Sequence, residues 1–194
     1  MTLWTTIRDR ITPTRVARGG LLSTTIETAQ KSGFFTWFAF VRTTDHAASG
    51  LGGTITFRPS GPKFHDLVEM QWTLDPALRI SAMELVLSRA FIDDAREGIY
   101  ARDISKSFLR AATPDADRTA LGELANEFEV AHSYPVIMAA SQERPQLPAQ
   151  PSPGFEVFLG SREHFEQSLT TCTLVLEQTG EGVDRRLRIS VAAH

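Results

Sequence analysis

Two histidine–aspartate neighbours are the residues of this sequence best suited to chemistry. Asp45 precedes His46, and His65 precedes Asp66. Both pairs fall at the ends of expected strands or in loops, so they approach one another if those strands are adjacent. Two imidazoles and two carboxylates then serve acid–base catalysis, as in a small hydrolase, or bind a divalent metal. No helical His-Glu-x-x-His or other fixed metal spacing accompanies them. Two solvated loop histidines are therefore the simpler interpretation, and we expect no catalytic activity, metal or other cofactor.

Two further features resemble reactive motifs without meeting their requirements. The glycine-rich loop at 49–54 leads into an apparent strand, whereas a phosphate-binding loop leads into a helix N-terminus. Cys172 is the one cysteine of the chain, which excludes an intramolecular disulfide and a multi-cysteine zinc site. It lies in an apolar run, which favours a buried, unreactive thiol.

A dense mixed-charge cluster surrounds a polar break near residues 93–98. Arg89 stands in an otherwise apolar run, and Arg102 lies four residues before Lys106 on an expected helix. Arginine is enriched at interfaces because its planar fork of donors binds carboxylates well. We therefore expect Arg89 and Arg102 to contact an acidic partner or ligand. The alternative is a solvated, ion-paired helix face, whose pairs contribute little to stability.

Charge is unevenly distributed along the 194 residues, whose formal net charge is −3. Residues 1–65 carry +5, residues 66–129 carry −6 and residues 130–194 carry −2. A pI near 6.0 argues against a nucleic-acid binder. The basic segment 1–20 is nearly free of acids, as in a short amphipathic helix or a targeting segment. It lacks the apolar stretch of a secretory signal, and no apolar run is long enough to span a bilayer, so we expect a cytoplasmic protein.

Strand patterns dominate the first half of the chain. Residues 34–42 (FFTWFAFVR) are aromatic and branched, and their two apolar faces predict a central strand covered on both sides. Residues 53–58 and 66–74 follow after short polar connections, and the second alternates apolar and polar side chains. Three consecutive strands predict an antiparallel meander. We expect Trp37 or Phe38, Trp72 and Phe108 to lie in the core.

Helical patterns occupy the middle of the chain. Asp75 and Pro76 resemble a helix start, which predicts a helix over 77–92. Residues 84–92 also alternate as a strand would, and both alternatives remain open. An apolar stripe predicts a helix over 99–112, which Pro114 ends, and a further helix is expected over 113–129.

A proline-rich connector at 142–154 separates this body from the last 40 residues. Four prolines exclude a helix or central strand there, so we expect an exposed, extended segment. The other elements expected in this part are strands at 134–140 and 155–159, a helical turn at 161–168, and a hairpin formed by 170–178 and 185–193. We expect residues 155–194 to complete the domain that begins at residue 1.

Taken together, these patterns predict one α+β domain: a mostly antiparallel sheet, built from a meander and a C-terminal hairpin, with two or three helices packed on it. No motif matches a known family. Size, acidity and layout are loosely those of small bacterial chaperones and immunity proteins, an analogy of composition and fold only. The absence of a catalytic signature favours a non-enzymatic protein-binding module, such as an adaptor, assembly factor, chaperone or inhibitor. The alternatives are the hydrolase above and a binder of an apolar ligand held against the aromatic residues 34–40.

Overall fold

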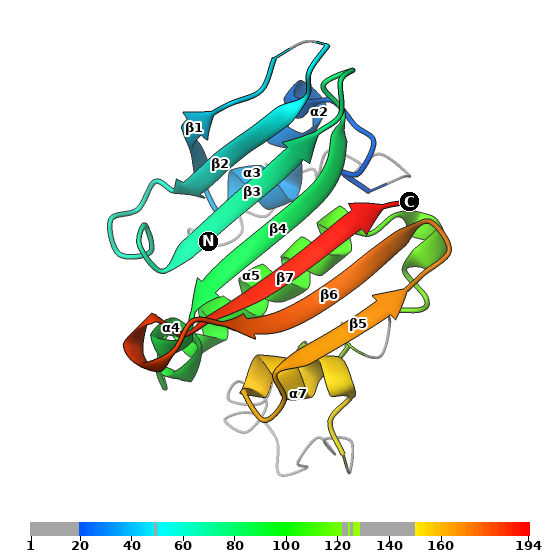
Figure 1. Ribbon diagram of the computed structural model, residues 1–194. Helices are drawn as coiled ribbons and strands as arrows, with labels where there is room; N and C mark the ends of the chain where they lie inside the picture. The colour runs from blue at the N-terminus through cyan, green and yellow to red at the C-terminus, as the bar shows by residue number, and fades with distance from the viewer. Residues whose placement is uncertain (1–19, 49, 122–123, 125, 129–149) are drawn as a thin grey trace, which may run out of the picture.

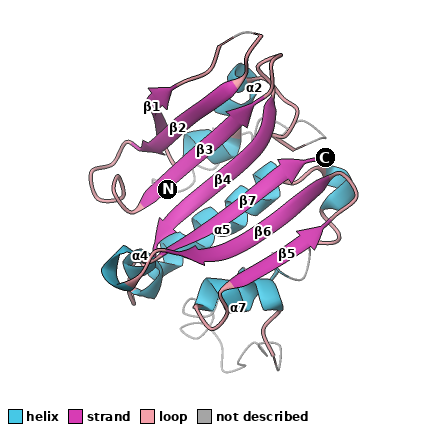
Figure 2. Ribbon diagram, viewed as in Figure 1, coloured by secondary structure: helices cyan, strands magenta, loops and turns pink. Residues whose placement is uncertain are grey.

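A seven-stranded antiparallel sheet forms one layer of the molecule, and helices form the other (Figures 1 and 2). The computed structural model describes residues 20–48, 50–121, 124, 126–128 and 150–194. The strands are β1 (Phe40–Asp45), β2 (Gly53–Pro59), β3 (Val68–Leu74), β4 (Ile80–Ser88), β5 (His164–Ser168), β6 (Cys172–Thr179) and β7 (Arg186–Ala193).

The strand order is β1-β2-β3-β4-β7-β6-β5. An N-terminal meander of four strands therefore meets a C-terminal meander of three, and β4 pairs with β7 at the junction. Every pairing is antiparallel. This arrangement confirms the predicted α+β class, and it places residues 164–193 in the same sheet as residues 40–88.

In the view of Figure 2, α5 (Gly98–Ala112) passes behind the sheet, whereas α4 (Arg89–Asp93) and α7 (Pro153–Leu159) lie at its lower margin. The longest of the described helices, α5, confirms the helix predicted at 99–112. The others are α2 (Ile26–Gln30), α3 (Gly33–Trp37), α4 (Arg89–Asp93) and α7 (Pro153–Leu159), together with the single 3-10 turns η1 (Asp115–Asp117) and η2 (Gly182–Asp184). None of these helices is long and apolar enough to cross a membrane.

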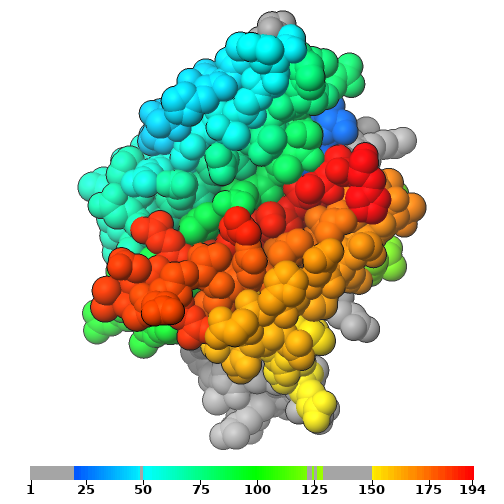
Figure 3. Space-filling view, in the orientation of Figure 1, coloured from blue at the N-terminus to red at the C-terminus, as the bar shows by residue number. Residues whose placement is uncertain are grey.

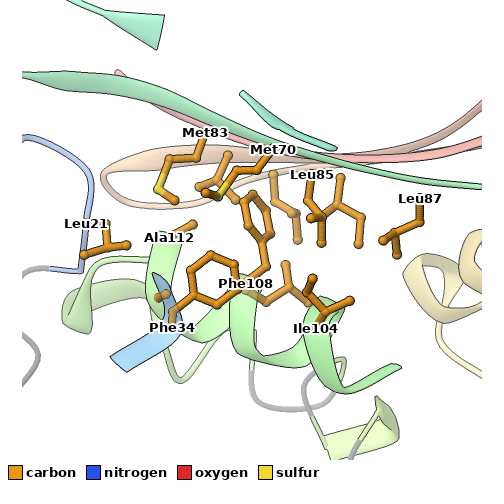
Figure 4. Packing of buried hydrophobic residues seen from close by; sticks show 14 of the residues in the cluster. Leu21, Phe34, Met70, Met83, Leu85, Leu87, Ile104, Phe108 and Ala112 are labelled. Carbon is orange, nitrogen blue, oxygen red and sulfur yellow. The ribbon is translucent and has the colours of Figure 1, made fainter. Parts of the chain in front are cut away.

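The core lies between α5 and the sheet (Figure 4). Phe108 on α5 is fully buried and points toward Met70 and Leu85 of the sheet. Trp72 on β3 is also fully buried, and its ring lies 4.4 Å from that of Phe57. Buried residues alternate with half-buried or exposed ones over most of β2, β3, β4, β6 and β7, which gives the sheet one apolar face.

The central strand predicted at 34–42 is wrong. Ser32 caps a helical turn through its hydroxyl, which accepts from the N–H of Phe35, and residues 33–37 form α3. Ala39 then turns the chain with φ of +48°, and β1 runs from Phe40 along an edge of the sheet. The aromatic residues do enter the core, but from a helix, and Trp37 is 73% exposed. The local capping and burial of phenylalanines outweighed β-propensity here.

The helix predicted at 77–92 is also wrong, and the strand alternative for this segment is correct in part. Asp75 closes a hairpin turn, since its carboxylate accepts from the N–H of Arg79, and Leu78 has φ of +57°. The chain then continues as β4 to Ser88 and becomes helical only at α4. β3 and β7 pair with β4 on its two sides and bind its backbone N–H and C=O groups. This pairing makes the segment a strand, although its sequence fits a helical periodicity as well.

The strand predicted at 155–159 and the helical turn predicted at 161–168 are both wrong: the first segment is helical and the second contains a strand. Residues 155–159 belong to α7, whose first turn is capped by the Ser152 hydroxyl and begins with Pro153. Residues 164–168 form the edge strand β5 instead of a helical turn.

The hairpin of β6 and β7 is confirmed. In the helix expected over 113–129, η1 and helical backbone at 124 and 126–128 are observed. The expected strand at 134–140, segment 1–19 and most of the proline-rich connector lie outside the described residues.

Candidate functional site

The two histidine–aspartate pairs lie at opposite ends of β2. The N–H of His46 donates to the carbonyl of Thr54 (2.9 Å), whereas Nδ1 of His65 lies 3.2 Å from the carbonyl of Pro59. Pro59 follows Thr54 by five positions along an extended strand, which corresponds to about 17 Å. The structure therefore does not bring the four side chains together.

The carboxylate of each aspartate in these pairs already accepts hydrogen bonds from nearby residues of the chain. Asp45 accepts from Nη1 of Arg42 at 2.5 Å and from the N–H of Ala47. Asp66 accepts from Nη1 of Arg58 at 3.3 Å. Among the residues that the structure describes, no three His, Cys, Asp or Glu side chains are grouped as a metal would require.

Arg89 joins two helices instead of facing solvent. Its side chain is 15% exposed and pairs with Asp93 one helical turn later. Its Nη1 donates to the carbonyl of Phe158 (2.6 Å) and its Nη2 to that of Leu159 (3.0 Å), both at the C-terminal end of α7. Gly160, with φ of +82°, ends that helix directly against the guanidinium. The cation thus satisfies carbonyls that have no partner within α7.

Arg102 lies on α5 and is half-buried. Burial lowers the pKa of its guanidinium, because the surrounding protein displaces water from the charge. A contact of Arg89 or Arg102 with an acidic partner stays a prediction, and the observed contacts of Arg89 also give that side chain a structural role.

A buried carboxylate, Asp117, was missed in the sequence. It is 1% exposed and accepts from the N–H groups of Thr170 (2.8 Å) and Thr171 (2.9 Å), from the Thr171 hydroxyl and from the thiol of Cys172 (3.7 Å). Burial alone raises the pKa of Asp117, but the hydrogen bonds from Thr171 and Thr170 outweigh it and lower the pKa to about 2. This carboxylate fixes the turn between β5 and β6.

The second face of the sheet is covered by none of the described helices, and Figure 3 shows it toward the viewer. We call it the open face. It consists of the half-buried and exposed residues that alternate with the core residues, namely Thr54, Thr56 and Arg58 on β2; Glu69, Gln71 and Thr73 on β3; Ala82, Glu84, Val86 and Ser88 on β4; Arg186, Arg188, Ser190 and Ala192 on β7; Thr173, Val175, Glu177 and Thr179 on β6; and His164, Glu166 and Ser168 on β5.

A row of arginine–glutamate contacts crosses the open face, in which Glu84 and Glu69 are neighbours of like charge. Arg188 pairs with Glu177 and lies 3.6 Å from Glu84. On β2 and β3, Nη2 of Arg58 donates to Glu69 at 2.6 Å. Burial raises the pKa of Glu84, while the charge of Arg188 opposes this shift. The charges of the open face are therefore largely neutralised within the chain.

A parallel row near the other end of the strands carries no charge. Thr54 is opposite Thr73, Thr73 is opposite Ala82, and Ala82 is opposite Ala192. The row continues through Thr173 on β6 and ends at Ser168 on β5. Because these side chains are short, this part of the open face is comparatively flat.

A hollow of about 370 Å³ lies at the β1 margin of the open face. We call it the threonine hollow. Its walls are Thr43, Thr44, Thr56, Arg58, His65 and Glu69. Of the candidates proposed from sequence, only His65 lines it. The signal that sequence reasoning lacked is the register of β1 against β2, which no local pattern encodes.

Comparisons with protein-family models, with curated proteins and with solved structures each find no match for this chain. What the molecule does must therefore be argued from its own surface.

Proposed function

We propose that this chain is a non-enzymatic protein-binding module whose binding surface is the open face. The observation that carries this proposal is a broad sheet face that none of the described helices covers. The six strands of the open face, each about 4.8 Å wide and on average about 24 Å long, present roughly 690 Å². One side of a standard protein–protein interface buries about 800 Å², which is similar.

The chemistry of the open face favours a protein over other partners. Three arginines and four glutamates leave it nearly neutral, whereas nucleic acids and anionic membranes attract basic surfaces. Its ion pairs are already formed within the chain, so a partner meets matched charges instead of isolated ones. Val86 and Val175, which lie on the open face beside these ion pairs, are half-buried and offer apolar surface to a partner.

The alternatives receive less support. A hydrolase needs acid and base groups within hydrogen-bond reach of one substrate, and His46 and His65 stand at opposite ends of β2. An apolar-ligand site against residues 34–40 is disfavoured because Phe34, Phe35 and Phe40 pack on one another and on the core. The chain has one buried, unpaired cysteine and needs no oxidising compartment, so the proposal retains a cytoplasmic location, which cell fractionation tests.

Photo-crosslinking tests the module directly. A photoreactive residue at Val175, on β6 within the open face, should capture a protein in native lysate that the same residue at Ala95 does not capture. Ala95 is an exposed position between α4 and α5, away from the open face. Val175→Lys should then weaken capture of that protein at least tenfold while Ala95→Lys leaves it unchanged. Equal capture from both positions, or an unaffected Val175→Lys variant, contradicts the proposal.

A further inference from the structure

The threonine hollow has features of a small-ligand site that protein binding by the open face does not require. Its volume of about 370 Å³ falls at the lower end of the range of ligand pockets. Six polar residues line it: three threonines, an arginine, a histidine and a glutamate. The threonine methyl groups and the carbon stems of the longer side chains also contribute to the wall, so it matches a ligand that offers both hydrogen-bonding groups and C–H surface.

A β-bulge in β1 gives the hollow two of its hydroxyl groups. Arg42 pairs with Phe57 and Thr44 with Thr56, so β1 contains one residue, Thr43, more than β2 at this point. In a regular strand, successive side chains point to opposite faces, and consecutive threonines do not share a wall. The bulge lets Thr43 and Thr44 line the same hollow, and bulges commonly redirect side chains in this way.

The ionic groups of the hollow are fixed before any ligand arrives. Glu69 accepts from Nε of Arg58 (3.1 Å) as well as from Nη2, and Asp66 accepts from Nη1. The guanidinium is thus oriented, and its charge is matched by two carboxylates. His65 is held likewise: a carbonyl oxygen only accepts, so Nδ1 donates to the carbonyl of Pro59, and this bond orients the ring.

We propose that the threonine hollow binds a neutral, hydroxyl-rich small molecule of the size of a mono- or disaccharide. A phosphate or other anion is disfavoured because the charge of Arg58 is already balanced. An apolar ligand is disfavoured because it would displace water from the hydroxyl groups of Thr44 and Thr56 without replacing its hydrogen bonds, whereas the Thr43 hydroxyl already donates to the carbonyl of Thr56 (3.2 Å). Sugar hydroxyls both donate and accept, and they match the mixture of the Glu69 acceptor with threonine and guanidinium donors.

Titration by NMR tests this inference. The full chain, isotope-labelled, is titrated with glucose, galactose, N-acetylglucosamine, maltose and trehalose, and separately with glucose 6-phosphate and inorganic phosphate. At least one neutral sugar should produce saturable shifts at Thr43, Thr44, Thr56 and His65, and its phosphorylated counterpart should bind no more tightly. The inference is overturned if no sugar in the series saturates these signals at millimolar concentration, or if phosphate does so better.

Matched threonine variants locate the effect. Thr44→Val removes one hydroxyl at nearly constant volume and should weaken sugar binding about three- to tenfold, as loss of one neutral hydrogen bond predicts. Thr73→Val is the control, because Thr73 lies on the open face outside the hollow. Equal affinities for the two variants refute binding in the hollow. These measurements use no protein partner, so their outcome is separate from that of the crosslinking at Val175.

Discussion

Replacing Asp117 with asparagine tests whether one buried carboxylate holds the turn between β5 and β6. The two carboxylate oxygens of Asp117 receive four donors, three of which converge on Oδ2. Asparagine has the same shape but only one acceptor oxygen. Whichever way its amide is oriented, an NH₂ group faces at least one backbone N–H, and that donor loses its partner.

The expected cost follows from these bonds. A buried donor without a partner costs about 1–3 kcal/mol, and hydrogen bonds to a charged acceptor contribute about 1 kcal/mol more than neutral ones. Asp117→Asn should therefore lower the free energy of unfolding by about 2–4 kcal/mol at pH 7. Asp115→Asn is the matched control, since Asp115 is exposed and pairs with Arg118 at 2.7 Å on the surface. That change should cost less than about 1 kcal/mol.

The effect of Asp117 also depends on pH with a definite sign. The pKa of Asp117 in the folded protein is about 2, below the value of about 3.9 in an unfolded chain. Its stabilisation is therefore complete above about pH 5 and is lost as pH falls through 4 toward 2. Asparagine does not titrate, so the difference in stability between wild type and Asp117→Asn should narrow over the same range.

Urea denaturation followed by circular dichroism measures both predictions, at pH 7 and at pH 3. The reasoning is refuted if Asp117→Asn costs no more than Asp115→Asn at pH 7. It is also refuted if the cost of Asp117→Asn is larger at pH 3 than at pH 7.

Three other changes probe the core, the end of α7 and the thiol. Phe108→Ala, at a fully buried position, should cost about 3–5 kcal/mol in urea denaturation, and Tyr100→Ala, at an exposed position of the same helix, less than about 1.5 kcal/mol. Gly160→Ala should cost about 1–2 kcal/mol, because φ is +82° and a Cβ would lie 3.1 Å from a guanidinium, whereas Gly61→Ala meets no atom within 4 Å and should be neutral. Burial raises the pKa of Cys172 to about 11, so a thiol reagent at pH 8 should modify it only when denaturant unfolds the chain.

Elements with a complete local signal were predictable from sequence. The strand ending at Leu74 alternates apolar and polar side chains, and the helix ending at Ala112 has a clear apolar stripe and a following proline. The hairpin of β6 and β7 carries matching apolar faces on both sides of a glycine-containing turn. In each case the periodicity of apolar residues and the turn residues predict the same element, and the packing observed in the fold agrees with that local preference.

Elements that depend on distant partners were not predictable. Residues 80–88 carry both helical and strand periods, and pairing with β3 and β7 decides between them. Phe34 and Phe35 enter the core because Ser32 caps a turn there, which outweighs their preference for strands. The same limit applied to the site. The carbonyls that Arg89 binds belong to residues about 70 positions later, so no local pattern in the sequence indicates that contact.

The pairing of β4 with β7 has a consequence for how the chain is made. A ribosome delivers β4 about 100 residues before β7, and until then one edge of β4 has exposed N–H and C=O groups. The meander of β1 to β4 can form early from local contacts, but the sheet closes only through a contact of long sequence separation, which slows folding. During synthesis, that unpaired edge is the part of the molecule most open to strand exchange with a neighbouring nascent copy and to capture by a chaperone.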